Sequence, residues 1–187
     1  TTFNAGFDAR YYYPIYRNFI WAGRAAADFS WGNQKIIYYL GGADGWLMFG
    51  NNQKFDENNN LIKERYYNTS TPVANDQDYA FQSLAVNLRG FLQNTANGNN
   101  AVVMNSEFRL PVFSTFLNRP INNAFLRNFQ LVQFIDLGTA WNGGYNKISR
   151  PTVVFGNQNN NVFVKIKAGG VGPFAGGYGF GARSMLF

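Results

Sequence analysis

Several short segments of the chain alternate apolar and polar residues at every second position. In residues 3–13, one alternate set is aromatic or alanine, and the other set includes Asp8. Residues 21–31 repeat this arrangement, with an apolar row opposite Arg24. Successive side chains of a strand point to opposite faces, so each segment predicts a β-strand with one apolar and one charged face.

The same alternation returns later in the chain. We expect further strands over Ala101–Leu110, Asn128–Trp141, Asn161–Lys167 and Phe174–Leu186. In the last of these, glycines occupy one alternate set, which predicts room for a folded segment against that face. We predict a turn over Pro14–Asn18, with strand pairing ending at the proline because it cannot donate to a β-ladder. The predicted fold class is all-β and antiparallel.

Between the second and third predicted strands the alternation is lost, over residues 33–100. This stretch contains Gly41-Gly42, the run Asn58-Asn59-Asn60 and mixed charges. A structureless segment of this length is uncommon in a compact domain and is usually functional. We interpret it as one long extracellular loop that could carry a local hairpin.

The polarity of the strands points to a membrane. Charged rows that face inward and aromatic rows that face outward suit a wall between lipid and a water-filled lumen. No apolar run approaches the ~20 residues that a spanning helix needs, so a membrane role would use strands. Short and long connections alternate along the chain, as in outer-membrane barrels. We therefore expect part of a transmembrane antiparallel β-barrel, in contact with the lipid of a bacterial outer membrane.

Composition narrows the possible chemistry. Of the 187 residues, 18% are aromatic and 14% are charged, against about 25% charged residues in a typical soluble domain. The chain has no cysteine and no histidine, which excludes disulfides, Cys/His metal sites and a histidine-based catalytic triad within it. We expect no enzymatic activity, no cofactor and no metal. The net charge of +6 comes from scattered residues, so we expect no nucleic-acid partner.

Five short sequences follow one another in an informative order. They are Gly41-Gly42, Leu88-Arg89-Gly90-Phe91, Asn105-Ser106-Glu107-Phe108-Arg109-Leu110-Pro111, Phe134-Ile135-Asp136-Leu137-Gly138-Thr139-Ala140-Trp141 and Gly177-Tyr178-Gly179-Phe180-Gly181-Ala182-Arg183. In this order they resemble the carboxyl-terminal half of the BamA-type outer-membrane assembly and translocation barrels, the bacterial surface antigen family. The resemblance covers essentially all of residues 1–187.

The resemblance implies an architecture and a function. It implies five to six strands of a sixteen-stranded barrel, with the remaining strands and any periplasmic domains outside this chain. It also implies insertion, assembly or translocation of client outer-membrane polypeptides. Accessory lipoproteins or a larger membrane complex would be further partners.

A candidate site follows from the resemblance and from strand parity. The long loop can fold back into the lumen and place Arg89 against the inner wall, where Glu107 and Asp136 share lumen-facing parity on neighbouring strands. One guanidinium could bridge both carboxylates, because its planar fork binds carboxylates and stays charged. The alternatives are a solvated loop arginine and carboxylates that only keep the lumen wet.

Four further residues complete the candidate site. Gly90 would permit a tight backbone turn, and Phe91 would pack beside the arginine. Arg109 and Arg183 are expected either to join the same lumen network or to line the lumen.

Two other classes of function remain open from the residues. A surface-exposed β-rich protein could bind glycans through its aromatic residues, or be a structural outer-membrane component without insertase activity. The outward apolar rows argue against a soluble sandwich, and aromatic residues near strand ends are more simply an interfacial belt: Tyr13, Trp21, Trp31 and Trp141. A lipase carried on such a barrel would need a Gly-x-Ser-x-Gly nucleophile elbow, which this chain lacks.

Overall fold

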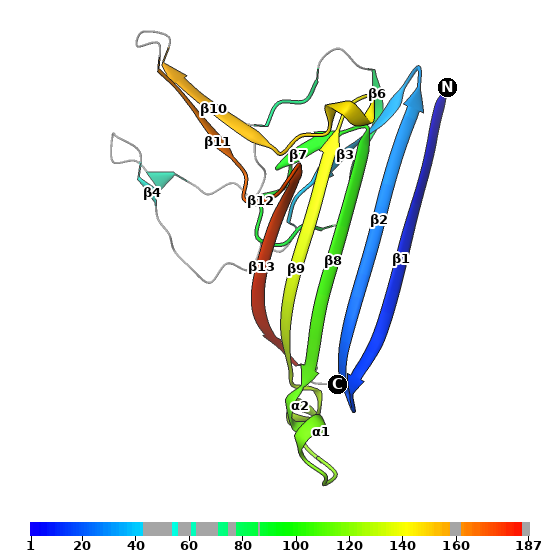
Figure 1. The fold of residues 1–187 in the computed structure, drawn as a ribbon, viewed down its shortest axis with the longest axis vertical. Helices are drawn as coiled ribbons and strands as arrows, with labels where there is room; N and C mark the ends of the chain where they lie inside the picture. Colours follow the sequence, from blue (N-terminus) through cyan, green and yellow to red (C-terminus); the bar gives the residue numbers. More distant parts are fainter. Residues whose placement is uncertain are drawn as a thin grey trace.

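The computed structural model describes residues 1–42, 54–55, 61–62, 71–74, 78–85, 87–157 and 162–184. Its largest element is an open, antiparallel six-stranded sheet with the order β1-β2-β8-β9-β13-β12 (Figure 1). These strands are β1 (Thr2–Tyr16), β2 (Phe19–Gly32), β8 (Asn100–Pro111), β9 (Gln130–Trp141), β13 (Phe174–Arg183) and β12 (Gly170–Val171). The all-β prediction is confirmed, and the described strands form a sheet that does not close on itself.

Each predicted strand agrees with an observed one to within a few residues, and the structure contains further strands that were not predicted. The segment predicted over Asn161–Lys167 is β11 (Val162–Lys167), and it pairs with β10 (Thr152–Asn157) in a separate hairpin. Sequence analysis had left β10 in a loop. Two predictions lie outside the described residues, namely the asparagine run 58–60 and the last two residues of the strand predicted over Phe174–Leu186.

The first hairpin is longer than predicted. Pairing continues through Pro14, which lies opposite Ile20, and only Arg17 and Asn18 remain as the turn. The prediction that pairing ends at the proline was wrong. Proline is tolerated here because β1 is an edge strand of the described sheet, so its missing N–H can face away from β2.

The strand register gives the sheet two unlike faces. On what we call the open face, large apolar side chains are exposed: Phe3, Phe7, Tyr11, Trp31, Met104, Ile135, Tyr178 and Phe180. On what we call the covered face lie the charged residues and the glycines of the candidate site: Asp8, Arg24, Glu107, Asp136, Gly138 and Gly177. The two faces are therefore those that the alternation predicts.

The segment predicted as a long loop contains a second sheet. Strand β3 (Lys35–Leu40) lies between β6 (Tyr79–Leu84), which is parallel to it, and β7 (Ala96–Gly98), which is antiparallel. Two short strands, β4 (Lys54–Phe55) and β5 (Leu61–Ile62), also pair. Sequence analysis missed β3 because its last four residues are all buried, and a strand covered on both faces shows no alternation.

The described hydrophobic core lies between this second sheet and the covered face. Its buried members come from both sides of that contact: Tyr38, Leu40, Ala85, Leu88, Ala96, Ala101, Val103, Ala140 and Ala175. The main sheet contributes mainly small residues, and Gly138 is one point at which the two sides approach closely. A Cβ at Gly138 would lie 3.1 Å from a Leu40 methyl and 3.4 Å from a Leu88 methyl.

Within the described residues, three short helices lie in the connections. Helices α1 (Val112–Phe116) and α2 (Ala124–Asn128) follow β8, at one end of the main sheet (Figure 1). A 3-10 helix (Tyr145–Lys147) lies in the connection after β9, at the opposite end of that strand. In the described ranges, no helix has both the length and the hydropathy to cross a membrane.

Two asparagines, the buried Asn99 and the half-buried Asn142, join the second sheet to the main sheet. The Asn99 side-chain amide donates to the Ser30 carbonyl at 2.6 Å, and its side-chain oxygen accepts from the Gly143 N–H at 3.1 Å. Asn142 accepts from the Asn99 N–H and from the Tyr79 hydroxyl.

Nearby, Trp141 is buried with 9% of its surface exposed, so its prediction as an interfacial belt residue was wrong.

We expect Asn99→Ala to lower the free energy of unfolding by about 1–2 kcal/mol, because buried polar groups of two segments lose their partners. The measurement is the midpoint of urea unfolding of the complete protein in lipid. Asn146→Ala is the control, because Asn146 is exposed on the 3-10 helix. Equal midpoints for the two variants would contradict this prediction.

Candidate functional site: a loop arginine on the covered face

Antiparallel pairing of β8 with β9 brings two carboxylates onto one face. Asn105 lies opposite Asp136, and Glu107 lies opposite Phe134. These four residues are two positions apart on each strand, so all of them have covered-face parity. Glu107 and Asp136 are thus diagonal neighbours across the strand pair, within reach of one long side chain.

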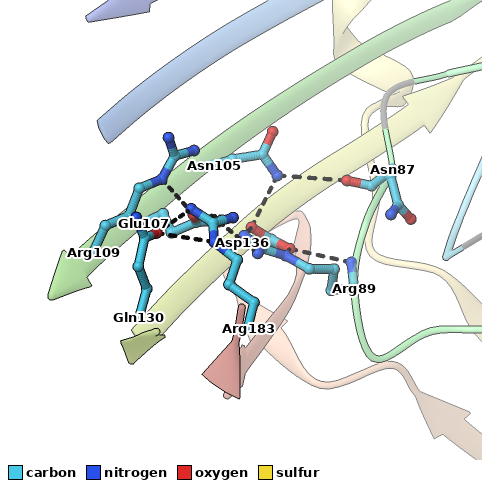
Figure 2. Close-up of polar contacts among 8 residues, drawn as sticks. All are labelled: Asn87, Arg89, Asn105, Glu107, Arg109, Gln130, Asp136 and Arg183. Atoms are coloured by element: carbon cyan, nitrogen blue, oxygen red, sulfur yellow. Dashed lines mark hydrogen bonds and ion pairs between the residues drawn. The ribbon is translucent and has the colours of Figure 1, made fainter. Parts of the chain in front are cut away.

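Arg89 comes from the turn between β6 and β7 and occupies this position. Its Nε and Nη2 donate to the two oxygens of Asp136 at 2.7 and 2.8 Å, and its Nη1 donates to Glu107 Oε2 at 2.8 Å (Figure 2). The guanidinium therefore holds Asp136 with two parallel bonds and Glu107 with a third. We call this set of three residues the Arg89 lock.

Asp136 is fully buried and fully partnered. It also accepts from the backbone N–H of Arg89 at 3.2 Å and from Asn105 Nδ2 at 2.9 Å. Burial of a carboxylate is unfavourable unless charge pairing and hydrogen bonds compensate, and four donors do so here. The hydrogen bond to Asp136 raises the pKa of the Arg89 guanidinium above its usual value, so the arginine stays charged at every physiological pH.

The aromatic ring of Phe134 lies against the Arg89 guanidinium. The Arg89 guanidinium carbon lies 3.8 Å from the centre of the Phe134 ring, a cation–π geometry. The ring in turn lies over Gly179 of β13, where a Cβ would come within 2.7 Å of the ring edge. The glycine thus leaves the space in which Phe134 lies flat beneath the arginine.

Glycines also set the position of the loop backbone. Gly90 has φ +85°, a left-handed conformation that favours glycine, although a Cβ there would meet nothing within 4 Å. Gly42 donates its N–H to the Phe91 carbonyl at 2.9 Å, and a Cβ on Gly41 or Gly42 would collide with the backbone of residues 91–93. The Gly41-Gly42 pair therefore lets β3 run directly against the tip of the loop.

The main sheet makes a second close contact with the tip of the loop that carries Arg89. A Cβ on Gly177 would lie 2.7 Å from the Arg89 carbonyl oxygen and 3.4 Å from the Phe91 ring. The space predicted beside the glycines of β13 is thus occupied by the tip of the loop. Phe91 packs beside the lock, against the hydrophobic core.

Both additional arginines contact Glu107. Arg109 Nε donates to Glu107 Oε1 at 2.6 Å, and Arg183 Nη1 lies 3.5 Å from the same oxygen. Arg183 also donates to Gln130 Oε1 through two nitrogens at 3.1 Å each (Figure 2). Of the two possibilities stated for these arginines, the structure favours membership of the network.

A separate ionic cluster lies further along the covered face. Asp8 accepts from Arg10 at 3.0 Å and from Arg24 at 2.6 Å. Between this cluster and the lock is a cavity of about 370 Å³, whose polar lining includes Arg10, Arg24, Asn87, Arg89, Glu107 and Arg109. The side chains of Asp8, Arg10 and Arg24 are more exposed than those of the lock, so their ion pairs are screened by solvent.

Sequence analysis missed two members of the site. Asn105 and Phe134 have the same strand parity as Glu107 and Asp136, but the sequence analysis gave neither residue a role. Strand parity could have identified both, because each is two residues from a lock carboxylate on the same strand. Their distances from Arg89 depend on the position of the loop tip, which parity alone does not define.

The geometry of the lock holds a loop in place on the covered face. The lock carboxylates are occupied by arginines, and in the described part of the chain no group of three acidic residues is placed to bind a metal ion. Comparison with family models, curated proteins and solved structures gives no match to this chain. The interpretation of the site therefore depends on its geometry and on the resemblance of its motifs.

Proposed function

We propose that this chain is the carboxyl-terminal part of an outer-membrane β-barrel of the BamA-like type. The barrel would act in the insertion, assembly or translocation of outer-membrane polypeptides. Its partners would be outer-membrane lipid, client polypeptides and accessory lipoproteins or a larger membrane complex.

The observation that carries this proposal is the Arg89 lock on the covered face. A loop of almost 70 residues is fixed by its tip to two adjacent strands, at the centre of one face of the sheet, while the other face exposes apolar side chains. In a closed barrel, the covered face would be the lumen and the open face would contact lipid. The loop would then fill the lumen and brace the wall from within.

A barrel of this type would work without covalent chemistry. Client strands would enter the membrane at a separable seam, where unpaired strand edges offer backbone hydrogen bonds. This seam would lie outside the present chain. The internal loop would hold the barrel strands in place while the seam opens. The attachment of the loop to these strands must therefore persist when water enters the lumen.

Reconstitution tests the proposal directly. The complete protein is placed in phospholipid vesicles, and an unfolded client barrel is added from urea. We expect the client to gain protease protection and heat-modifiable mobility faster than in empty vesicles. The matched control is a vesicle that contains an unrelated outer-membrane barrel of similar size.

Equal client folding in both kinds of vesicle would overturn the proposed activity. A protein that is itself folded in the membrane under those conditions would then fit the alternative, a structural outer-membrane component without insertase activity. Depletion in cells gives an independent readout, since loss of the protein should lower the levels of several outer-membrane barrels together.

A further inference from the structure

The connection between β8 and β9, which we call the 112–129 hairpin, is fixed at one end of the main sheet (Figure 1). Sequence analysis expected a short connection here, but it holds α1 and α2. The turn of the first hairpin anchors it. Arg17 donates to the Thr115 carbonyl at 3.0 Å and to Asn118 at 2.9 Å, and Asn18 donates to the Ser114 carbonyl at 3.1 Å.

The aromatic side chains of this hairpin continue the open face. Phe129 lies two residues before Leu131 and has its parity, and its ring centre is 5.8 Å from Phe113 and 5.9 Å from Phe125. Directly after the end of β13, Ser184 donates to the Phe125 carbonyl at 2.9 Å. The apolar row of the sheet therefore extends past the strand ends into the hairpin.

Large apolar side chains of the hairpin are exposed. Phe116 is 64% exposed, Leu117 is 53% exposed and Phe125 is 45% exposed. Exposed apolar groups that are continuous with a larger apolar surface indicate an interaction site. The exposed residues are separated in sequence but belong to one short, anchored element.

The charge of the hairpin has a single sign. No aspartate or glutamate occurs between Arg109 and Asp136. Arg119 and Arg127 are exposed, and neither guanidinium makes a hydrogen bond or an ion pair to any described residue. With Arg17 in the adjoining turn, three guanidinium groups lie at this end of the sheet, and none of them forms an ion pair with a carboxylate of the described residues.

We propose that the 112–129 hairpin is an interfacial anchor for anionic phospholipid, an inference that rests on the proposed membrane location. Its exposed Phe and Leu side chains would enter the boundary between acyl chains and headgroups, and Arg119 and Arg127 would bind lipid phosphates. Aromatic residues favour this depth of a bilayer, and arginine side chains extend from it to reach the headgroups. The combination is that of an amphipathic surface element.

Continuity and charge favour lipid over a protein as the occupant. The hairpin prolongs the same face that the barrel would present to acyl chains, so its aromatics would meet the headgroup layer where the strands end. Guanidinium groups without carboxylates suit a phosphate surface, to which they bind in bidentate fashion. A protein partner is one of the outcomes that the test distinguishes.

Spin labels can locate the hairpin relative to the bilayer. The chain has no cysteine, so a single introduced thiol labels one position of it. The labelled variants of the complete protein are Phe116→Cys and Phe125→Cys on the hairpin, Asn122→Cys as the exposed control, and Phe7→Cys on the open face. Collisions with oxygen and with a water-soluble nickel complex are measured in phosphatidylcholine vesicles with and without phosphatidylglycerol.

We expect the Phe7 label to report the acyl region and the Phe116 and Phe125 labels to report the headgroup boundary. The Asn122 label should report water. Phosphatidylglycerol should draw the two hairpin labels deeper, and the double change Arg119→Gln with Arg127→Gln should abolish that shift. The control double change is Lys147→Gln with Lys165→Gln, which removes two exposed cations elsewhere and should leave the shift intact.

Each contrary result has a separate meaning. A Phe7 label in water would overturn the membrane location, and with it the proposed function. A Phe7 label in lipid with both hairpin labels in water would overturn the anchor alone, as would hairpin labels that become protected only when periplasmic protein is added. Insensitivity to phosphatidylglycerol and to both arginine changes would overturn the binding of anionic headgroups.

Discussion

Arg89→Ala is expected to lower the free energy of unfolding by about 3–5 kcal/mol, the cost typical of removing one partner from a buried ion pair. The reason lies in Asp136, which is fully buried and receives three of its four hydrogen bonds from Arg89. The backbone bond can persist in alanine, but the charge of the carboxylate would lose its only cationic partner within bonding distance among the described residues. Glu107 would keep Arg109, so most of the loss should arise at Asp136.

The measurement is the temperature at which the compact, heat-modifiable band of the complete protein is lost on electrophoresis. Arg89→Lys should be intermediate, because an ammonium keeps the charge but cannot form parallel bonds with one carboxylate while it also reaches the other. Arg10→Ala is the matched control, since it removes an arginine from an exposed ion pair on the same face. Similar band temperatures for Arg89→Ala and Arg10→Ala would contradict a stabilising lock.

The same variants separate stability from function. If the lock only braces the wall, Arg89→Ala protein that is folded at low temperature should insert clients at a normal rate. If the loop also positions clients, insertion should fall at temperatures where the barrel remains folded. Client folding by Arg89→Ala and wild type, compared well below both band temperatures, decides between these roles.

The sequence predicts the wall of this protein well because a strand with unlike faces records its orientation in every second residue. Asp136 and Glu107 were placed on one face from parity alone, and Gly177 was read as space for a folded segment. The bridge by Arg89 needed the resemblance as well, because nothing in local periodicity says where a loop tip will return.

The errors have physical causes. Strand β3 was missed because Ile37, Tyr38, Tyr39 and Leu40 are all buried, so no polar row marks its second face. The prediction ended the pairing of the first two strands too early, at Pro14. An edge strand tolerates a proline that a central strand would not. The contact of the Phe134 ring with Arg89 was missed because it depends on the position of the loop backbone, which is distant in sequence from Phe134.

Gly177→Val tests the same attachment from the wall. Its Cβ would lie 2.7 Å from the Arg89 carbonyl oxygen, and because this is a backbone contact, the loop tip must move for the side chain to fit. A shifted tip would misplace the guanidinium relative to Asp136 and Glu107. We expect a loss of about 3 kcal/mol, at the upper end of the usual cost of overpacking.

Gly181→Val is a closely matched control. It lies on the same strand and the same face, and a Cβ there would meet nothing within 4 Å. Valine has a higher strand propensity than glycine, so local backbone preference should favour both variants equally. Any difference between them then reports the contact with the loop.

Trypsin provides a readout for the position of the tip, because the bond after Arg89 is a cleavage site that the lock holds against the wall. We expect cleavage at this bond to be slow in the wild type and in Gly181→Val, and fast in Gly177→Val. The band temperature should fall in the same order. Slow cleavage in Gly177→Val, with an unchanged band temperature, would mean that the tip can shift without releasing Arg89, and the close approach of β13 would then have no part in holding the loop.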